Sequence, residues 1–308
     1  MFLKKIINSI ADAGKELLSK TFTGKRNVAS LLELSDDLIS YKGIASGIAI
    51  AREISETYKE LSIEDKKKFF QEIDKKLKPN MDLVEQKSIE FVKDKSKETL
   101  KSLAALAEGR RQEFIRRMNM APNGTAFLVS MREDLLRCVV EDPSLQDLDE
   151  DFRHLFRSWF NPGFLKLEKI TWETKAAILE RIIKYEKVHK IKDMDDLKRR
   201  LQEDRRFFAY FHPVLHDEPL IFVQVAFTEG LATCIQDIIK PTMDSKLKAD
   251  TATFYSISNC QQGLTNVTLG NFLIKRVVYE IQQENSKIKN FGTLSPLPGF
   301  VDWFNYLE

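Results

Sequence analysis

The sequence predicts an α+β protein with an all-helical N-terminal domain over residues 1–160 and a mixed α/β domain over residues 161–308. The first part is rich in Glu, Lys, Leu and Ala, and its apolar residues recur with helical spacing. After "NPGF" at 161–164, aromatic and β-branched runs typical of strands begin. The length of 308 residues also fits two domains of ordinary size.

The helical domain divides into several expected helices. "YKGIASGIAIAREISETYKEL" predicts one helix, and "SIEDKKKFFQEIDKKL" predicts another whose Ser62 and Asp65 have nearly the spacing of a capping box. The stretch 81–120 predicts at least one long helix that ends before "PNG". "FLVSMREDLLRCVVED" and "LQDLDEDFRHLFRSWF" predict two more. No group of residues arranged for chemistry is evident here, and we expect these helices to form a homo-oligomer.

The second domain begins with helical patterns and continues as a sheet. "RFFAYFHPV" and "PLIFVQVAF", joined by the turn "LHDE", predict a β-hairpin. A strand over 251–258, a helix that ends near 286 and a strand over 289–295 predict a β–loop–α–β unit. Its two strands are expected to be parallel, and ligands bind beyond the carboxyl ends of such strands. Ser258 and Ser295 lie at those ends.

The loop "NCQQGLTNVTLGN" joins the first of these strands to the helix. Gly263, Asn266 and Gly270 tolerate a positive φ or a close backbone approach. The loop leads to a helix N-terminus, where free amide groups favour an anion, and Lys275 and Arg276 follow. The pattern is compatible with a phosphate or pyrophosphate cradle. On spacing alone an ordinary capped helix start is favoured over the cradle, because no Walker or GxGxxG pattern is present.

Composition excludes several kinds of function. The 48 basic and 46 acidic residues nearly cancel, which argues against an overall nucleic-acid-binding field. Three cysteines without metal-site spacing favour a reducing compartment. His212 and His216 are four residues apart but lie in a strand-and-turn sequence, so no metal site is expected. Ser295 precedes Pro296, a common turn pair, and no histidine is obviously placed to activate it.

The sequence predicts a cytoplasmic protein without membrane association. No run of about 18 apolar residues that would span a bilayer occurs. The N-terminal stretch "MFLKKIINSIADAGKELLSK" is amphipathic, but it contains Asp12 and Glu16 and has no arginine before Arg26. A mitochondrial presequence is usually arginine-rich and poor in acidic residues, so a location in the mitochondrial matrix is the less favoured alternative.

Long strings of the sequence resemble the malonyl-CoA decarboxylase family. "SWFNPGFLKLEKITWET", "YEKVHKIKDMDDLKRRL", "DRRFFAYFHPVLHDEPLIFVQVAFT", "FYSISNCQQGLTNVTLGNFLIKRVV" and "FGTLSPLPGF" occur in the family's order. The resemblance is strong from Ser158 to Phe300 and diffuse across the helical half. It implies an N-acetyltransferase-like (GNAT-like) catalytic domain and conversion of malonyl-CoA to acetyl-CoA and CO2 without a metal or organic cofactor.

The resemblance also implies roles for particular residues. Ser295 matches the family's catalytic serine, and Ser256 on the neighbouring strand is a supporting candidate. Asn266 replaces a glycine common in the family, and we expect the loop to keep its shape because Asn tolerates left-handed geometry. The loop implied to hold the CoA pyrophosphate consists of Thr265, Asn266, Val267, Thr268, Leu269, Gly270 and Asn271.

One family feature has no counterpart in the sequence. In the family, a histidine well downstream of "SPLPGF" pairs with the serine and acts as the acid that protonates the α-carbon. The sequence ends at Glu308, and none of its four histidines corresponds to that residue. The expectation is an incomplete GNAT-like domain, from a truncated product or a fragment, with little or no decarboxylase activity.

Two other functions remain open from the sequence. A GNAT-type acyl-CoA N-acyltransferase would need an acceptor site and a base, such as a glutamate near the centre of the sheet. A non-enzymatic CoA-binding or helical interaction module would bind the ligand without turnover.

Overall fold

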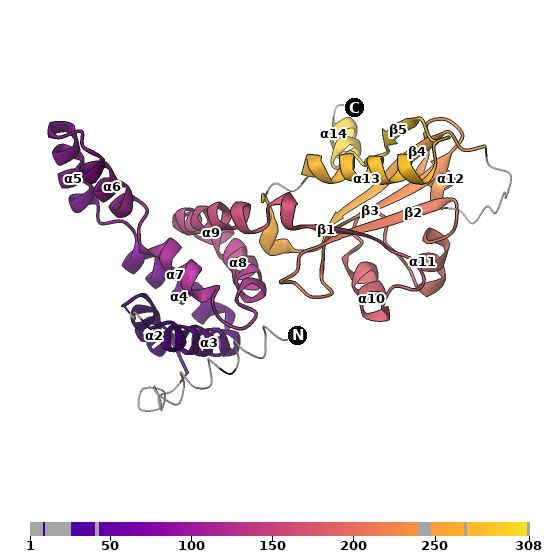
Figure 1. Cartoon of the computed structure of the whole chain (residues 1–308). Helices are drawn as coiled ribbons and strands as arrows, with labels where there is room; N and C mark the ends of the chain where they lie inside the picture. Colours follow the sequence, from indigo (N-terminus) through magenta and orange to yellow (C-terminus); the bar gives the residue numbers. More distant parts are fainter. Residues whose placement is uncertain (1–8, 10–25, 41–42, 240–247, 268–269, 307–308) are drawn as a thin grey trace. The chain divides into compact units, whose positions relative to one another are not determined.

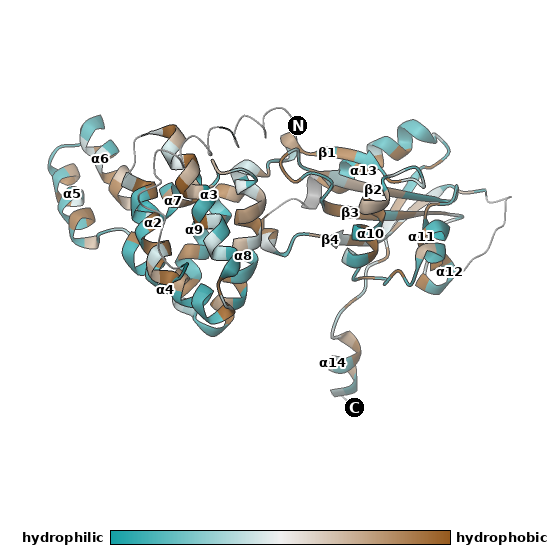
Figure 2. Cartoon of the chain, turned by 90° about the horizontal axis from the view of Figure 1, so that it is seen from below, coloured by the Kyte–Doolittle hydropathy of each residue, from teal (hydrophilic) through white to brown (hydrophobic). Residues whose placement is uncertain are grey.

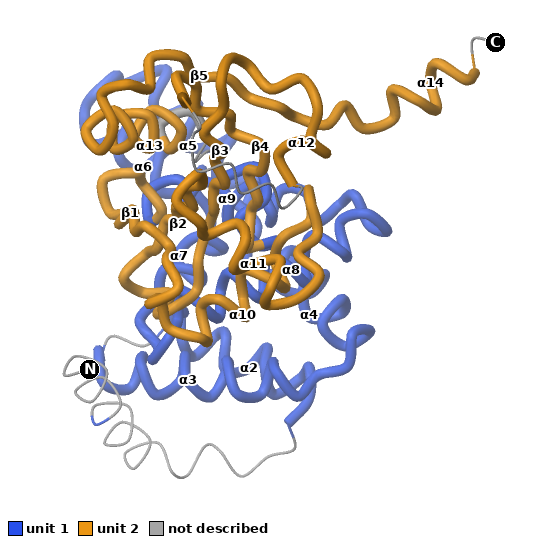
Figure 3. Tube along the Cα trace, turned by 90° about the vertical axis from the view of Figure 1, so that its right-hand side faces the viewer, with its two compact units in different colours: residues 1–159, 262–267 blue, residues 160–261, 268–308 orange. Residues whose placement is uncertain are grey.

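The computed structural model describes residues 9, 26–40, 43–239, 248–267 and 270–306. The chain divides into two compact units, residues 1–159 with 262–267 and residues 160–261 with 268–308 (Figure 3). Most of the amphipathic N-terminal stretch lies outside the described residues. Across the described ranges, no helix is both long enough and apolar enough to cross a membrane.

The first unit is helical (Figure 1). Its elements are α2 (Val28–Ser40), α3 (Ile44–Glu60), α4 (Ile63–Leu77), α5 (Met81–Lys93), α6 (Lys97–Ala107), α7 (Arg110–Met118), α8 (Gly124–Glu141), the 3-10 turn η1 (Pro143–Leu145) and α9 (Gln146–Trp159). Ser62 caps α4 as its sequence predicts, since its hydroxyl oxygen accepts the Asp65 amide at 3.1 Å. Aromatic side chains fill the core of this unit, where the Tyr58 and Phe127 rings lie 5.5 Å apart.

The long helix expected over 81–120 is three helices, α5, α6 and α7. Ser96 starts α6 because its hydroxyl accepts the Thr99 amide at 3.3 Å. Gly109 precedes α7 with φ 73, a conformation that ends a helix and that glycine adopts without strain. The predicted helical periodicity over 81–120 is therefore confirmed, whereas the two interruptions were not predicted.

The second unit is built on a sheet. Its elements are the 3-10 turn η2 (Pro162–Phe164), β1 (Lys166–Lys169), α10 (Ala176–Tyr185), α11 (Met194–Arg200), β2 (Arg205–Phe211), β3 (Pro219–Thr228), α12 (Ile235–Ile239), β4 (Thr251–Asn259), α13 (Gly270–Glu284), β5 (Asn290–Thr293) and α14 (Phe300–Tyr306). The α+β class predicted from the sequence is confirmed, and the alternation of apolar and polar residues along the elements can be followed in Figure 2.

The five strands are ordered β1-β2-β3-β4-β5. The first four pair antiparallel, so the predicted β2–β3 hairpin is confirmed, and β5 pairs parallel to β4 as expected of the β–loop–α–β unit. Two helices separate β1 from β2 and α13 separates β4 from β5, which is the GNAT-like topology that the resemblance implies. The sequence did not indicate β1, whose residues "KLEK" carry no strand pattern.

Helices cover both faces of the sheet, with α10 and α11 on one side and α13 on the other (Figure 1). On the first face, Ile182 and Leu197 are buried against Phe207 and Phe222. On the second, the hydroxyl of Tyr210 donates to the Leu273 carbonyl at 2.9 Å. Within α13, Leu273, Val277 and Ile281 are buried, and their spacing places them on one face of the helix.

Candidate functional site

The β4–β5 pair separates before β4 ends. Its parallel register runs from Thr251 opposite Asn290 to Phe254 opposite Thr293, and the Leu294 amide then donates to the Phe254 carbonyl at 2.9 Å. Beyond this point β4 still pairs with β3, but in the described part of the chain no strand lies along its other edge. The second half of β4 therefore has one open edge, which could pair with an extended ligand through backbone groups.

A β-bulge occurs in β4 at this position. Gln224 of β3 lies opposite Ser256, whereas Val225 lies opposite Phe254, so Tyr255 is an extra residue in the ladder. The side chains of two successive residues at the bulge reach acceptors in one polar cluster. Tyr255 donates its hydroxyl to Gln224 Oε1 at 2.9 Å, and Ser256 donates to Glu186 Oε2 at 2.7 Å.

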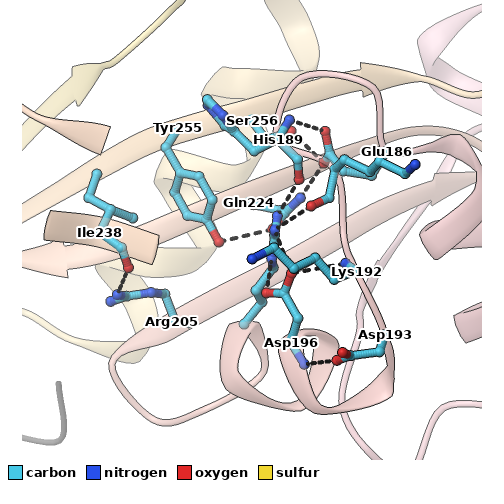
Figure 4. A network of polar contacts seen from close by, with 12 residues as sticks. Glu186, His189, Lys192, Asp193, Asp196, Arg205, Gln224, Ile238, Tyr255 and Ser256 are labelled. Carbon is cyan, nitrogen blue, oxygen red and sulfur yellow. Dashed lines mark hydrogen bonds and ion pairs between the residues drawn. The ribbon is translucent and has the colours of Figure 1, made fainter. Parts of the chain in front are cut away.

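Glu186 is the centre of this buried cluster (Figure 4). It directly follows α10 and is 4% exposed. Its Oε1 accepts the amides of Val188 and His189 at 2.7 and 2.9 Å and the Ser258 hydroxyl at 3.2 Å. Its Oε2 accepts Ser256 and the Gln224 amide group. Five donors therefore compensate the buried carboxylate, which holds the hydroxyl hydrogens of both serines.

A buried positive charge, Arg200, lies next to this cluster and is 4% exposed. Its Nη1 donates to Gln224 Oε1 at 3.3 Å and to the His189 carbonyl at 2.8 Å. Its Nε and Nη2 donate to the carboxylate of Asp196 at 2.9 and 3.2 Å. Arg200 is thereby neutralised by Asp196, and Gln224 connects it to Glu186 without an ion pair between the two.

Burial determines the protonation of the two aromatic neighbours. It raises the pKa of the Tyr255 hydroxyl, which stays protonated and can donate to Gln224. Burial also lowers the pKa of His189, although Glu186 opposes that shift. The His189 ring is therefore neutral at pH 7.

The two predicted serines have different environments. Ser256 is buried, and its hydrogen is directed to Glu186, which leaves its oxygen lone pairs for another donor. Ser295 is exposed, lies two residues after β5, and has no hydrogen-bond partner in the described ranges. Continuing the β4–β5 register by two residues would bring Ser295 opposite Ser256.

The loop after β4 begins with the 3-10 turn η3 (Gln262–Leu264). The Val267 amide then donates to the Leu264 carbonyl at 3.0 Å, which closes a four-residue turn with Thr265 and Asn266 at its centre. Asn266 has φ 62, so the expected left-handed geometry is confirmed. Thr265 and Asn266 are exposed and Val267 is buried, while Gly270 and Asn271 begin α13. Thr268 and Leu269 lie outside the described residues.

Residues 262–267 of this loop belong to the helical unit and are held by it. A Cβ on Gly263 would lie 1.9 Å from the Val129 carbonyl oxygen, so the loop approaches the backbone of α8 closely at this glycine. Arg132 of α8 is 0% exposed and donates through Nη1 to the carbonyls of Gly263 and Thr265 at 2.7 and 2.9 Å. Its Nε and Nη2 donate to Asp149 of α9 at 2.7 and 3.2 Å.

Sequence reasoning missed Glu186, Arg132 and Asp149. Glu186 stands after a helix without a motif, and the other two lie on charge-rich helices that resemble ordinary solvated surfaces. Ser256 and Ser258 offered the one available signal, because alternate residues of a strand share a face.

Comparison with known proteins identifies the family. The family model for the malonyl-CoA decarboxylase N-terminal domain matches residues 77–160, and that for the C-terminal domain matches residues 163–307. The crystal structure of malonyl-CoA decarboxylase from Rhodopseudomonas palustris is 45% identical, with a TM-score of 0.85 over 91% of this chain and 69% of that one. The chain belongs to the malonyl-CoA decarboxylase family.

Other members of the family are also similar to the chain. The malonyl-CoA decarboxylase structure from Agrobacterium vitis is 44% identical, with a TM-score of 0.83 over 89% of this chain and 68% of that one. The mitochondrial malonyl-CoA decarboxylase of the goose Anser anser anser is 38% identical over 203 residues. That match covers 63% of this chain and 40% of the goose protein, so the chain spans less than half of that relative.

Proposed function

We propose that the chain carries out the malonyl-CoA decarboxylase reaction, which converts malonyl-CoA and a proton to acetyl-CoA and CO2. The observation that carries this proposal is the similarity to the Rhodopseudomonas palustris decarboxylase, at a TM-score of 0.85 over 91% of the chain. The similarity includes both the helical unit and the sheet unit, and it therefore supports a shared reaction more strongly than one motif would.

The reaction requires stabilisation of a developing oxyanion. The bond between the α-carbon and the departing carboxylate breaks, and its electron pair moves into the thioester as an enolate. Hydrogen-bond donors directed at the enolate oxygen would lower the barrier, because the charge grows in the transition state. A proton then has to reach the α-carbon.

The two serines suit different parts of this task. Ser295 is proposed as the catalytic residue that donates to the oxyanion, since its exposed hydroxyl has no partner in the described ranges. Ser256 is proposed as a supporting residue that accepts a hydrogen bond, because Glu186 already takes its hydrogen. The backbone along the open edge of β4 is proposed to bind the extended part of the CoA thioester.

Residues Thr265 to Asn271 are proposed to bind the CoA pyrophosphate. The positive φ of Asn266 and the start of α13 at Gly270 support this assignment. The proposed reaction needs no metal or organic cofactor.

An acyltransferase function is less well supported by the geometry. It needs a base that can take a proton from an amine, and Glu186 is a buried glutamate in contact with residues of β3 and β4. That carboxylate is 4% exposed and already accepts five donors, so it has no lone pair directed at a substrate. The remaining alternative, a CoA-binding module, predicts binding without turnover.

The test is to incubate the chain with malonyl-CoA and to measure acetyl-CoA and CO2 together, with and without EDTA. We expect any turnover, which the sequence predicts to be low, to give equal amounts of both products, to be unaffected by EDTA, and to fall further in Ser295→Ala. Acylation of an added amine with release of free CoA would support the acyltransferase instead. The sequence-based expectation of little turnover stays a prediction that the measured rate tests.

Self-association and cellular location also remain proposals. The helices α5 and α6 have no buried side chain, and Met81, Ile89 and Val92 are exposed on α5, which supports homo-oligomer formation through the helical unit. Light scattering of the purified chain would measure the self-association.

The two bacterial structures described above support the cytoplasm as the location, whereas the goose relative is named a mitochondrial enzyme.

A further inference from the structure

We propose that Arg132 positions the turn over residues 264–267 in the proposed CoA-binding loop, and that it thereby controls affinity for the phosphate end of the substrate. The inference rests on the proposed function, because it takes CoA to be the ligand of this loop. It assigns Arg132 and Asp149 a positioning role, since neither is proposed to touch the substrate.

The first step is that all three nitrogen atoms of the Arg132 guanidinium donate hydrogen bonds. Nε and Nη2 bind Asp149, and Nη1 binds the carbonyls of Gly263 and Thr265 at 2.7 and 2.9 Å. The side chain is 0% exposed, and a buried guanidinium is stable only when such partners surround it. The carbonyls of Gly263 and Thr265 therefore help to compensate the buried charge. A change in the conformation of the loop would remove these acceptors from Arg132.

The second step follows from peptide geometry. In a trans peptide the carbonyl and the amide hydrogen point in opposite directions, and the described residues contain no cis peptide. Because Arg132 holds the carbonyls of Gly263 and Thr265, the amides of Leu264 and Asn266 point away from it. The Leu264 amide belongs to the 3-10 turn η3, whereas no acceptor among the described residues takes the Asn266 amide. An outward amide such as that of Asn266 is what an anionic phosphate binds.

The third step concerns the turn itself. A positive φ at the third residue of a four-residue turn is the mark of type II, and here Asn266 has φ 62. Types I and II differ by a rotation of the central peptide, which in this turn joins Thr265 to Asn266. The hydrogen bond from Arg132 to the Thr265 carbonyl holds that peptide in one of the two orientations.

The experiment compares Arg132→Met with a matched control, Arg111→Met. Arg111 of α7 is also buried, and it pairs with Asp74 and Asp151 at 2.5 and 2.6 Å without contacting the loop. Calorimetry would measure the affinity of each variant for CoA and for pantetheine, which lacks the pyrophosphate. All binding measurements are made at a temperature well below the lowest thermal unfolding midpoint among the wild type and its variants.

We expect Arg132→Met to weaken CoA binding by roughly 10- to 100-fold, the effect of losing one or two hydrogen bonds to a charged group. Its affinity for pantetheine should stay unchanged, and Arg111→Met should bind both ligands like the wild type. Arg132→Lys should lie between, because an ammonium group cannot serve Asp149 and two carbonyls with the same geometry.

Three results would overturn the proposal. These are unchanged CoA affinity in Arg132→Met, an equal loss of CoA and pantetheine, or the same loss in Arg111→Met. If Arg132→Met does not fold, the ratio of the CoA affinity to the pantetheine affinity is measured in Arg132→Lys instead. A ratio equal to that of the wild type would then overturn the proposal. Failure of the wild-type chain to bind CoA would instead contradict the proposed function, and the two failures are therefore distinguishable.

Discussion

Glu186 can be buried as a carboxylate because the backbone and three side chains direct donors at it. The amides of Val188 and His189 supply two hydrogen bonds, and Ser256, Ser258 and Gln224 supply three more. Without such compensation, the buried charge would cost several kcal/mol. The same arrangement fixes the directions of two serine hydroxyls next to the open edge of β4.

Replacing Glu186 by Gln tests this arrangement. The new amide group would direct its hydrogens at existing donors, so at least one buried donor would lose its acceptor. We expect the free energy of unfolding to fall by about 2–4 kcal/mol. Urea unfolding measures this, with Glu180→Gln on the exposed face of α10 as the control. Equal stability of the two variants would show that the cluster is not a structural centre.

At the scale of elements, a glycine in a turn and a glycine in a helix differ in the space available for a side chain. Gly263 in η3 approaches the Val129 carbonyl so closely that a Cβ would lie 1.9 Å from it, whereas Gly47 in α3 has open space around the same position. Gly263→Ala is expected to destabilise the protein by about 2 kcal/mol or more, because the turn or α8 would have to move. Gly47→Ala is expected to stabilise it by about 0.5–1 kcal/mol, because alanine favours a helix interior.

Thermal unfolding of both glycine variants checks these expectations. The pair also serves as its own control, since both substitutions add a single methyl group. A lower midpoint for Gly47→Ala, or an unchanged one for Gly263→Ala, would contradict the packing described here.

Glu284, at the C-terminal end of α13, makes a pH-dependent contribution to stability. Arg206 holds the pKa of Glu284 below its usual value, although partial burial opposes this, and Lys169 assists at 2.9 Å. The unfolded chain binds the proton first as pH falls, so the stability from Glu284 is present above the ordinary carboxyl pKa and is lost as pH falls through the lowered folded value. The side chain is 35% exposed, and screening keeps the contribution below about 1 kcal/mol.

A Glu284→Gln variant should therefore lose less stability than the wild type between pH 5 and about pH 3, the range in which carboxylates titrate. Unfolding midpoints across that range measure the difference. Identical slopes for the two proteins would show that the contacts of Glu284 with Arg206 and Lys169 contribute nothing to stability.

For the molecule as a whole, local patterns were predictable and distant contacts were not. Helical periodicity and aromatic runs predicted the helical half and the β2–β3 hairpin, because both depend on neighbouring residues. The β4 bulge at Tyr255 has no glycine or proline signal, and it decides how Ser256 meets Glu186. Arg132 and Gly263 are 131 positions apart, and one sequence contains no information that pairs them.

That long separation has a consequence for biosynthesis. Domains generally fold from the N-terminus as the ribosome releases them. The helical unit cannot do so fully, because residues 262–267 complete it and are translated only after β4. Until then, Arg132 has Asp149 but not the two carbonyls that Gly263 and Thr265 provide. The nascent helical unit therefore stays incomplete until most of the sheet sequence has been synthesised.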